Sequence, residues 1–256
     1  MSENARVSIS HEGHFTRIEL IDEATRNSLT QESIEGIYGA IEAAHERKSR
    51  VIVLSALGKS FCAGANFAGG FSPAENQESA VTFPDLLLRM VGTTIPIVAS
   101  VQGHALGGGL GLVAASTFVV ASSNAEFGTP EVNVGLFPMT IMAVLDRIVP
   151  RRALLEMMLL GERFSATRAM DLGLVQRVVE PAALSFETKH MAEKFAAKSP
   201  AAISRGLRAY KDQSDVSLER ALPMLFDRLV DCLSTNDARE GLLAFMEKRS
   251  PEFTGT

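Results

Sequence analysis

The chain is poor in the residues that mark disulfide-rich and metal-binding proteins. It has no tryptophan, two tyrosines and two cysteines among its 256 residues. Cys62 and Cys232 form no Cys-x-x-Cys pair, which argues against a disulfide framework and against a thiolate zinc site. We therefore expect no metal site in this protein.

A basic excess and a long apolar run are also missing. Lys and Arg total 25 against 30 Asp and Glu, for a formal net charge of -5, which argues against nucleic-acid binding. The most apolar stretch, residues 105–122, starts rich in glycine and is interrupted by Ser116 and Thr117, so we expect no membrane span. The first residues, MSEN, lack the basic-then-apolar pattern of a secretory signal, and we expect a cytoplasmic protein.

What the chain does contain is ordinary globular composition with recognisable strand patterns. Hydrophobic residues make up 46%, charged residues 21%, and the mean hydropathy is +0.12, which suits one large α/β domain or a core with a smaller appendage. Residues 7–21 alternate like a strand pair around a turn near Gly13. Three short apolar runs are typical of buried strands: residues 51–54, 97–101 and 118–121.

Helical patterns lie between these strands and after them. One helix is expected to begin at Ser28 or Thr30, since either residue can cap it. After Val179 four segments are helical in pattern: residues 181–198, 201–211, 216–233 and 237–248. No linker separates them from the core. We therefore divide the chain into a core with the active site, residues 1–198, and a C-terminal helical region for oligomerisation, residues 199–256.

Two glycine-rich segments are candidates for ligand binding. Residues 61–65, FCAGA, follow the strand at 51–54, and residues 102–109, QGHALGGG, lead into an apolar helix. Small residues and helix N-termini leave backbone N–H groups unpaired, so two such loops can direct two donors at one oxygen, an oxyanion hole. Close backbone packing explains such glycines equally well. A dinucleotide fingerprint is excluded, because its third glycine would fall on Leu112 or Ala114.

The order of four segments along the chain is informative. They are FCAGA at 61–65, GHALGGG at 103–109, FGTPE at 127–131 with Gly135 after it, and EG at 240–241 followed by AFMEKR at 244–249. In order and spacing they resemble the motif set of the enoyl-CoA hydratase/isomerase (crotonase) family. The resemblance implies an α/β fold, a ββα spiral followed by C-terminal helices that build a trimer, often paired into a hexamer. It also implies an acyl-CoA thioester substrate, no cofactor beyond the coenzyme A of the substrate, and oxyanion donors at the N–H groups of Ala65 and Gly108.

Glu131 is the candidate acid/base residue. When a proton leaves the carbon beside a thioester carbonyl, charge moves to the carbonyl oxygen, and a base must lie within reach of that carbon. Glu131 follows Pro130 and precedes an apolar stretch, where a charged residue is unusual. From this setting alone it could equally cap a turn or form an ion pair. The resemblance favours the catalytic role.

The chain departs from the family pattern at two positions. Hydratases of the family commonly carry a second glutamate where this chain has Gly111, and an aspartate is usual where it has Asn66. A lone glutamate suits moving a proton between two carbons, so Gly111 favours isomerisation and leaves hydration open. A hydrolase or decarboxylase using the same loops stays open too, as does a non-catalytic acyl-CoA-binding scaffold. A nucleophilic Cys62 is disfavoured, because the pattern offers it no base.

Other residues are expected to hold coenzyme A. By resemblance, its adenine would contact backbone around Ala63 and residues 24–27, and the guanidinium of Arg26 could meet a phosphate. Phe245 and Lys248, on the final helix, would approach the ligand of a neighbouring subunit. From sequence alone these two could equally be a core aromatic and a solvated lysine.

Overall fold

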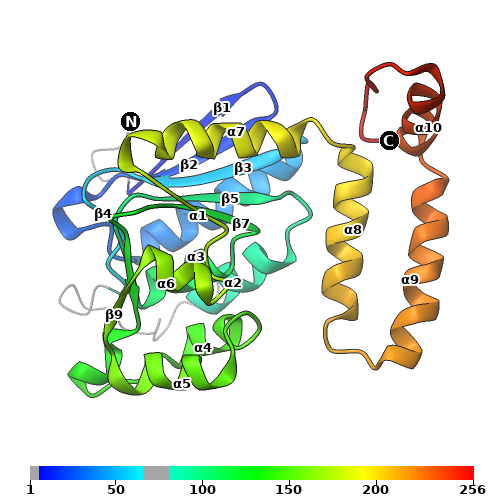
Figure 1. Cartoon of the computed structure of the whole chain (residues 1–256). Coiled ribbons are helices and arrows are strands. Elements are labelled where there is room, and N and C mark those ends of the chain that lie inside the picture. The colour runs from blue at the N-terminus through cyan, green and yellow to red at the C-terminus, as the bar shows by residue number, and fades with distance from the viewer. Residues whose placement is uncertain (1–5, 66–80) are drawn as a thin grey trace.

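The computed structural model describes residues 6–65 and 81–256, which form two sheets surrounded by helices (Figure 1). In this part of the chain the larger sheet has six strands in the order β1-β2-β3-β5-β7-β10. They are β1 Val7–Glu12, β2 Phe15–Leu20, β3 Val51–Ala56, β5 Ile97–Val101, β7 Phe118–Ser122 and β10 Arg177–Val179. β1 pairs antiparallel with β2, and the remaining neighbours pair in parallel. The expected strand pair and the three buried strands are therefore confirmed.

A smaller sheet is made by strands of three residues each. In order across the sheet they are β4 Ser60–Cys62, β6 His104–Leu106, β8 Glu126–Gly128 and β9 Arg163–Ser165. The first three are parallel, and β9 is antiparallel to β8.

The chain alternates between the two sheets in a repeated unit. Each unit has one strand in the larger sheet, the next strand in the smaller sheet, and then a helix: β3-β4-α2, β5-β6-α3 and β7-β8-η3. The three helices are α2 Phe83–Gly92, α3 Gly108–Ala114 and the 3-10 helix η3 Pro130–Val134. This is the expected ββα arrangement.

The central strands β3, β5 and β7 of the larger sheet are buried on both faces, which explains their apolar sequences. Because side chains alternate along a strand, Ile52 and Leu54 enter the main core, whereas Val51 and Val53 pack beneath α7 Leu184–Ala196. Helix α1 Gln31–Glu46 covers the main-core face together with α3. Its cap is Thr30, one of the two expected, whose side chain accepts a hydrogen bond from the Ser33 N–H.

The remaining elements follow the smaller sheet and lead to the C-terminus. They are η1 Glu23–Thr25 near the start of the chain, then α4 Met139–Leu145, α5 Arg151–Leu160, α6 Ala166–Asp171, η4 Pro181–Ala183, α8 Pro200–Gln213, α9 Leu218–Leu233 and α10 Asn236–Glu247. Figure 1 shows α8, α9 and α10 standing to one side of the sheets. Among residues 6–65 and 81–256 no helix combines the length and the apolar character needed to cross a membrane.

The last two helices expose an unusual number of large apolar side chains. Exposed on α9 are Leu218, Leu222, Phe226, Leu229, Val230 and Leu233, and exposed on α10 are Leu242, Leu243, Phe245 and Met246. An apolar surface of this extent is typical of a protein–protein contact.

Candidate active site

The smaller sheet brings the three predicted catalytic positions to one edge. β4, β6 and β8 are parallel neighbours, so the segments that follow them leave the same edge of the sheet. Ala65 comes after β4, Gly108 after β6 and Glu131 after β8. Residues from three separate repeat units therefore meet at one place.

The orientation of the Ala65 amide follows from a hydrogen bond on the other side of its peptide. The Leu29 N–H donates to the Gly64 carbonyl over 2.8 Å. In a trans peptide the carbonyl and the N–H point in opposite directions, so the Ala65 N–H points away from Leu29. Gly64 has φ +95, a left-handed conformation that other residues rarely adopt, which explains glycine at this turn.

The Gly108 amide is oriented in the same way. The Gly111 N–H donates to the Gly107 carbonyl over 3.1 Å in the first turn of α3. The Gly108 N–H belongs to that same peptide and therefore points out of the helix N-terminus, where N–H groups lack partners within the helix. The Gly107 N–H donates to the Gly128 carbonyl over 2.9 Å, which ties this loop to β8.

The two loops touch each other. A Cβ placed on Gly64 would lie 3.6 Å from the Gly108 nitrogen, and one placed on Gly109 would lie 2.3 Å from the Cys62 carbonyl oxygen. Gly109 thus allows the close backbone packing considered from the sequence, and the same packing brings the Gly108 amide against the first loop.

Glu131 lies against the second loop. A Cβ on Gly107 would come within 2.8 Å of Glu131 Oε1, so the carboxylate covers Gly107 next to the Gly108 amide. Glu131 Oε2 is buried and has no hydrogen-bond partner among the described residues. This oxygen is therefore not held in an ion pair within the described part of the chain. Burial raises the pKa of Glu131 above its ordinary value, and a backbone hydrogen bond offsets part of that rise.

This raised pKa predicts the acid limb of the pH–rate profile. A carboxylate that removes a proton must itself be ionised, so kcat/KM should fall at acidic pH with an apparent pKa above that of an ordinary glutamate. Initial rates with an enoyl-CoA substrate between about pH 4 and pH 8 would measure it. A limb at or below the ordinary glutamate value would contradict the assignment.

The raised pKa of Glu131 also predicts how the stability of the fold depends on pH. Stability should decrease as pH rises, whereas the reaction rate should increase. Between its ordinary and its raised pKa, Glu131 binds more protons in the folded than in the unfolded state, so its contribution to stability is lost as pH rises through that window. At neutral pH the charged side chain is therefore destabilising. We expect Glu131→Gln to raise the free energy of unfolding at pH 7, measured by denaturant titration. A less stable variant would show that the carboxylate has a structural partner.

The side chains around Gly111, the position at which the sequence departs from the expected two-glutamate pattern, are apolar. A Cβ on Gly111 would lie 2.5 Å from Ile141 Cγ2 and 3.4 Å from Phe83 Cζ. A Cβ on Gly108 would meet Leu29 Cδ1 at 2.6 Å. Sequence reasoning missed Leu29, Phe83 and Ile141 as residues of the site, because they come from distant segments with ordinary apolar patterns.

The positions expected to hold coenzyme A fall into two groups. The Ala63 N–H donates to the Arg26 carbonyl over 3.1 Å, which brings these two residues together beside the first loop. Arg26 is exposed, and both Arg26 and Asn27 have positive φ. Phe245, with 83% of its surface exposed, lies on α10, and Lys248 is the residue that follows the end of this helix. Because α10 stands to one side of the sheets, neither residue lies with the other predicted site residues of the same chain (Figure 1).

A buried asparagine supports the first group and was not predicted. Asn27 Nδ2 donates to the carbonyls of Leu57 and Ser60 over 2.9 and 2.8 Å, which fastens the Arg26 turn to the start of β4. The only sequence signal was an asparagine in a turn that needs positive φ.

Two further positions were named from the sequence. Cys62 is fully buried, and desolvation raises its pKa to about 12, which favours the thiol form and argues against a nucleophilic role. Asn66 lies outside the described residues.

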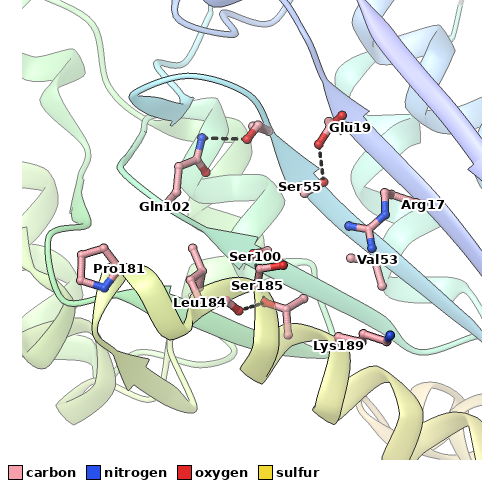
Figure 2. A pocket seen from close by; sticks show the side chains of 12 residues that line it. Arg17, Glu19, Val53, Ser55, Ser100, Gln102, Pro181, Leu184, Ser185 and Lys189 are labelled. Carbon is pink, nitrogen blue, oxygen red and sulfur yellow. Dashed lines mark hydrogen bonds between the residues drawn. The ribbon is translucent and has the colours of Figure 1, made fainter.

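A pocket of about 240 Å³ lies on the opposite face of the larger sheet, against α7 (Figure 2). Its walls include Arg17, Val53, Ser100 and Thr188. Val53 points to this face, whereas the core beneath α1 and α3 lies on the other. None of the residues predicted for the active site lines this pocket in the described part of the chain, so the two are separate.

Comparison with known proteins agrees with this fold. A family model described as enoyl-CoA hydratase/isomerase matches residues 11–256. The chain is 34% identical over 250 residues to enoyl-CoA hydratase domain-containing protein 3, mitochondrial, of Xenopus laevis, covering 96% of this chain and 85% of that protein. It is 33% identical over 260 residues to (E)-benzylidenesuccinyl-CoA hydratase of Thauera aromatica, covering 97% and 99%.

A solved structure of an enoyl-CoA hydratase is also similar to this chain. An enoyl-CoA hydratase of Mycobacterium smegmatis superposes with a TM-score of 0.91 at 32% identity, covering 98% of this chain and 99% of that one. The fold is thus the crotonase fold with a C-terminal helical region, as expected from the sequence. This chain belongs to the enoyl-CoA hydratase/isomerase family, whose members process acyl-CoA thioesters.

Proposed function

We propose that this enzyme isomerises the double bond of an enoyl-CoA through a thioester enolate, with Glu131 as the one acid/base group. Glu131 removes a proton from carbon 2 of a 3-enoyl thioester, and the C–H electrons pass into the conjugated enolate. The Ala65 and Gly108 N–H groups donate to the enolate oxygen. Glu131 then returns the proton to carbon 4, which leaves the 2-enoyl thioester without gain or loss of atoms. The reverse direction uses the same steps.

One observation carries this proposal: Glu131 Oε2, which is buried and has no hydrogen-bond partner among the described residues, lies beside two outward-facing amides. Oriented donors at a developing oxyanion stabilise it more than they stabilise the neutral carbonyl, and each is typically worth about 3 kcal/mol. The raised pKa of Glu131 supports a group that both accepts and returns a proton.

The apolar wall favours isomerisation over hydration. Water addition is most simply served by one carboxylate that activates water and a second that handles the proton at carbon 2. At Gly111 the space for a second carboxylate is filled by Ile141 and Phe83. Hydration is the second candidate, because relatives such as the protein of Thauera aromatica are named hydratases.

The proposal extends to ligand and assembly. Coenzyme A enters as part of the substrate, held by backbone around Ala63 and by Arg26, and the proton shuttle requires no further cofactor or metal. The exposed apolar faces of α9 and α10 support a homotrimer or a dimer of trimers, in which Phe245 and Lys248 approach a neighbour's ligand.

A panel of 2-enoyl- and 3-enoyl-CoA thioesters tests the reaction, with products resolved by mass and double-bond position. Conversion between the two series without a mass change supports isomerisation. A gain of one water identifies a hydratase, release of free coenzyme A a hydrolase, and loss of carbon dioxide from a carboxyacyl-CoA a decarboxylase. Binding without any conversion would identify a scaffold.

Lys248→Ala is expected to raise KM severalfold with little change in kcat, since the proposed contact is to a part of the substrate that does not react. Lys248→Arg is the matched control, because it keeps the charge and should keep KM near the wild-type value. Steady-state kinetics separates the two parameters. A fall in kcat at constant KM would argue against a carrier contact.

A further inference from the structure

A row of polar side chains crosses the whole smaller sheet. Ser60 Oγ lies 3.2 Å from His104 Nδ1, His104 Nε2 lies 3.2 Å from Glu126 Oε2, and Arg163 Nη1 donates to the same Glu126 oxygen over 3.2 Å. These residues come from β4, β6, β8 and β9 in turn. We call them the Ser60–Arg163 ladder.

Three members of the ladder lie at the opposite ends of their strands from the predicted catalytic groups, whereas Arg163 pairs with Gly128 at the other end and its side chain reaches back to Glu126. Ser60, His104 and Glu126 are the first residues of β4, β6 and β8. Ala65, Gly108 and Glu131 follow the other ends of the same three strands. Any slip between two of these strands would therefore displace an oxyanion donor relative to the other donor or to the carboxylate.

Backbone pairing alone holds these strands weakly. Each strand has three residues, and the β4–β6 register shifts between Ser60 and Cys62. The side-chain contacts supply the fastening that a longer strand would obtain from its own hydrogen bonds. Ser60 is itself firmly held, because its carbonyl accepts from Asn27 Nδ2 over 2.8 Å and from Gln102 Nε2 over 3.1 Å.

His104 is the central member, since its two ring nitrogens reach β4 on one side and β8 on the other. We propose that His104 is a positioning residue, which holds β4, β6 and β8 in the register that brings the Ala65 and Gly108 amides to Glu131. This inference rests on the proposed function. Serine, histidine and glutamate also compose hydrolytic triads, but Ser60 is only 4% exposed and lies at the strand end away from the outward-facing amides.

Two substitutions at one position test the role. His104→Phe keeps a ring but removes both nitrogens, and should lower kcat by about 10- to 100-fold with KM nearly unchanged, because small misplacements of reacting groups are costly. His104→Gln keeps a donor and an acceptor and should restore most of kcat. Arg163→Gln is the matched control. It weakens the contact between Glu126 and β9, the one strand of the smaller sheet that precedes none of the predicted catalytic groups.

An infrared measurement reports whether the two amides still contact the thioester carbonyl, and it does not depend on turnover. Butyryl-CoA labelled with carbon-13 at its carbonyl cannot isomerise, and the two amides should lower its infrared carbonyl frequency on binding to wild-type protein. In His104→Phe we expect the frequency to move back towards the value in solution, whereas His104→Gln and Arg163→Gln should resemble wild type.

The outcomes separate this inference from the proposed function. If wild type converts enoyl-CoA and lowers the carbonyl frequency, but His104→Phe does both equally well, the positioning role is overturned and the proposed function stands. Equal losses in His104→Phe and Arg163→Gln would also overturn it, since they would indicate general destabilisation. If wild type neither converts an enoyl-CoA nor shifts the carbonyl, the proposed function fails and the inference fails with it.

Discussion

Glu131→Gln is expected to lower kcat by about 10²- to 10⁴-fold, the range typical for loss of a general acid/base. The amide is close in shape to the carboxylate, so Gly107 remains covered and the two loops keep their contact. It cannot accept a proton from carbon 2. Because Oε2 has no hydrogen-bond partner among residues 6–65 and 81–256, the substitution should leave folding and acyl-CoA binding intact.

Single-turnover rates and acyl-CoA affinity, measured on the same preparation, would test this expectation. Glu180→Gln is the matched control, since Glu180 is exposed and belongs to the turn before η4. Near-normal rates for Glu131→Gln on every enoyl-CoA tested would show that another group moves the proton. A loss of binding that matches the loss of rate would indicate a structural role instead.

Gly111→Glu is expected to disable the enzyme alone and to change its reaction when combined with Ile141→Ala. The added Cβ would lie 2.5 Å from Ile141 Cγ2, and overpacking of this kind costs about 1–3 kcal/mol of stability. Ile141→Ala removes the closest contact, that with Ile141 Cγ2, and leaves Ile141 Cβ and Phe83 Cζ at 3.3 and 3.4 Å from the added Cβ. In the double variant the new carboxylate faces the site from α3, and hydration of a 2-enoyl-CoA should rise by up to about 10²-fold relative to wild type.

The single variant Ile141→Ala distinguishes the effect of the new carboxylate from the effect of the enlarged space. It creates a cavity and should lower the free energy of unfolding by about 2–5 kcal/mol without a gain in hydration. Thermal unfolding of the three variants measures the packing terms, and the ratio of hydrated to isomerised product measures the change of reaction. Equal hydration by wild type and the double variant would show that Gly111 does not limit water addition.

Local sequence patterns predicted most of the elements. The run at residues 51–54 is β-branched and apolar because β3 is buried on both faces, and residues 97–101 coincide with β5. The four C-terminal helical segments were found within a few residues of their observed bounds, since each has a clear helical period. The very short strands of the smaller sheet were not predicted, because three residues carry no measurable period.

The amino-acid sequence by itself determined the ingredients of the site: glycines at two turns, and a glutamate in an apolar setting. Their types and spacing are local properties, so they can be read without coordinates. Only the tertiary structure decided that the loops carrying Ala65 and Gly108 touch, and that Ile141 and Phe83 fill the space beside Gly111. It also decided that Glu131 has a buried oxygen with no partner in the part of the chain that the structure describes. These facts depend on contacts between segments far apart in the chain. Such contacts are set by the pairing of β4, β6 and β8, and no local pattern encodes that pairing.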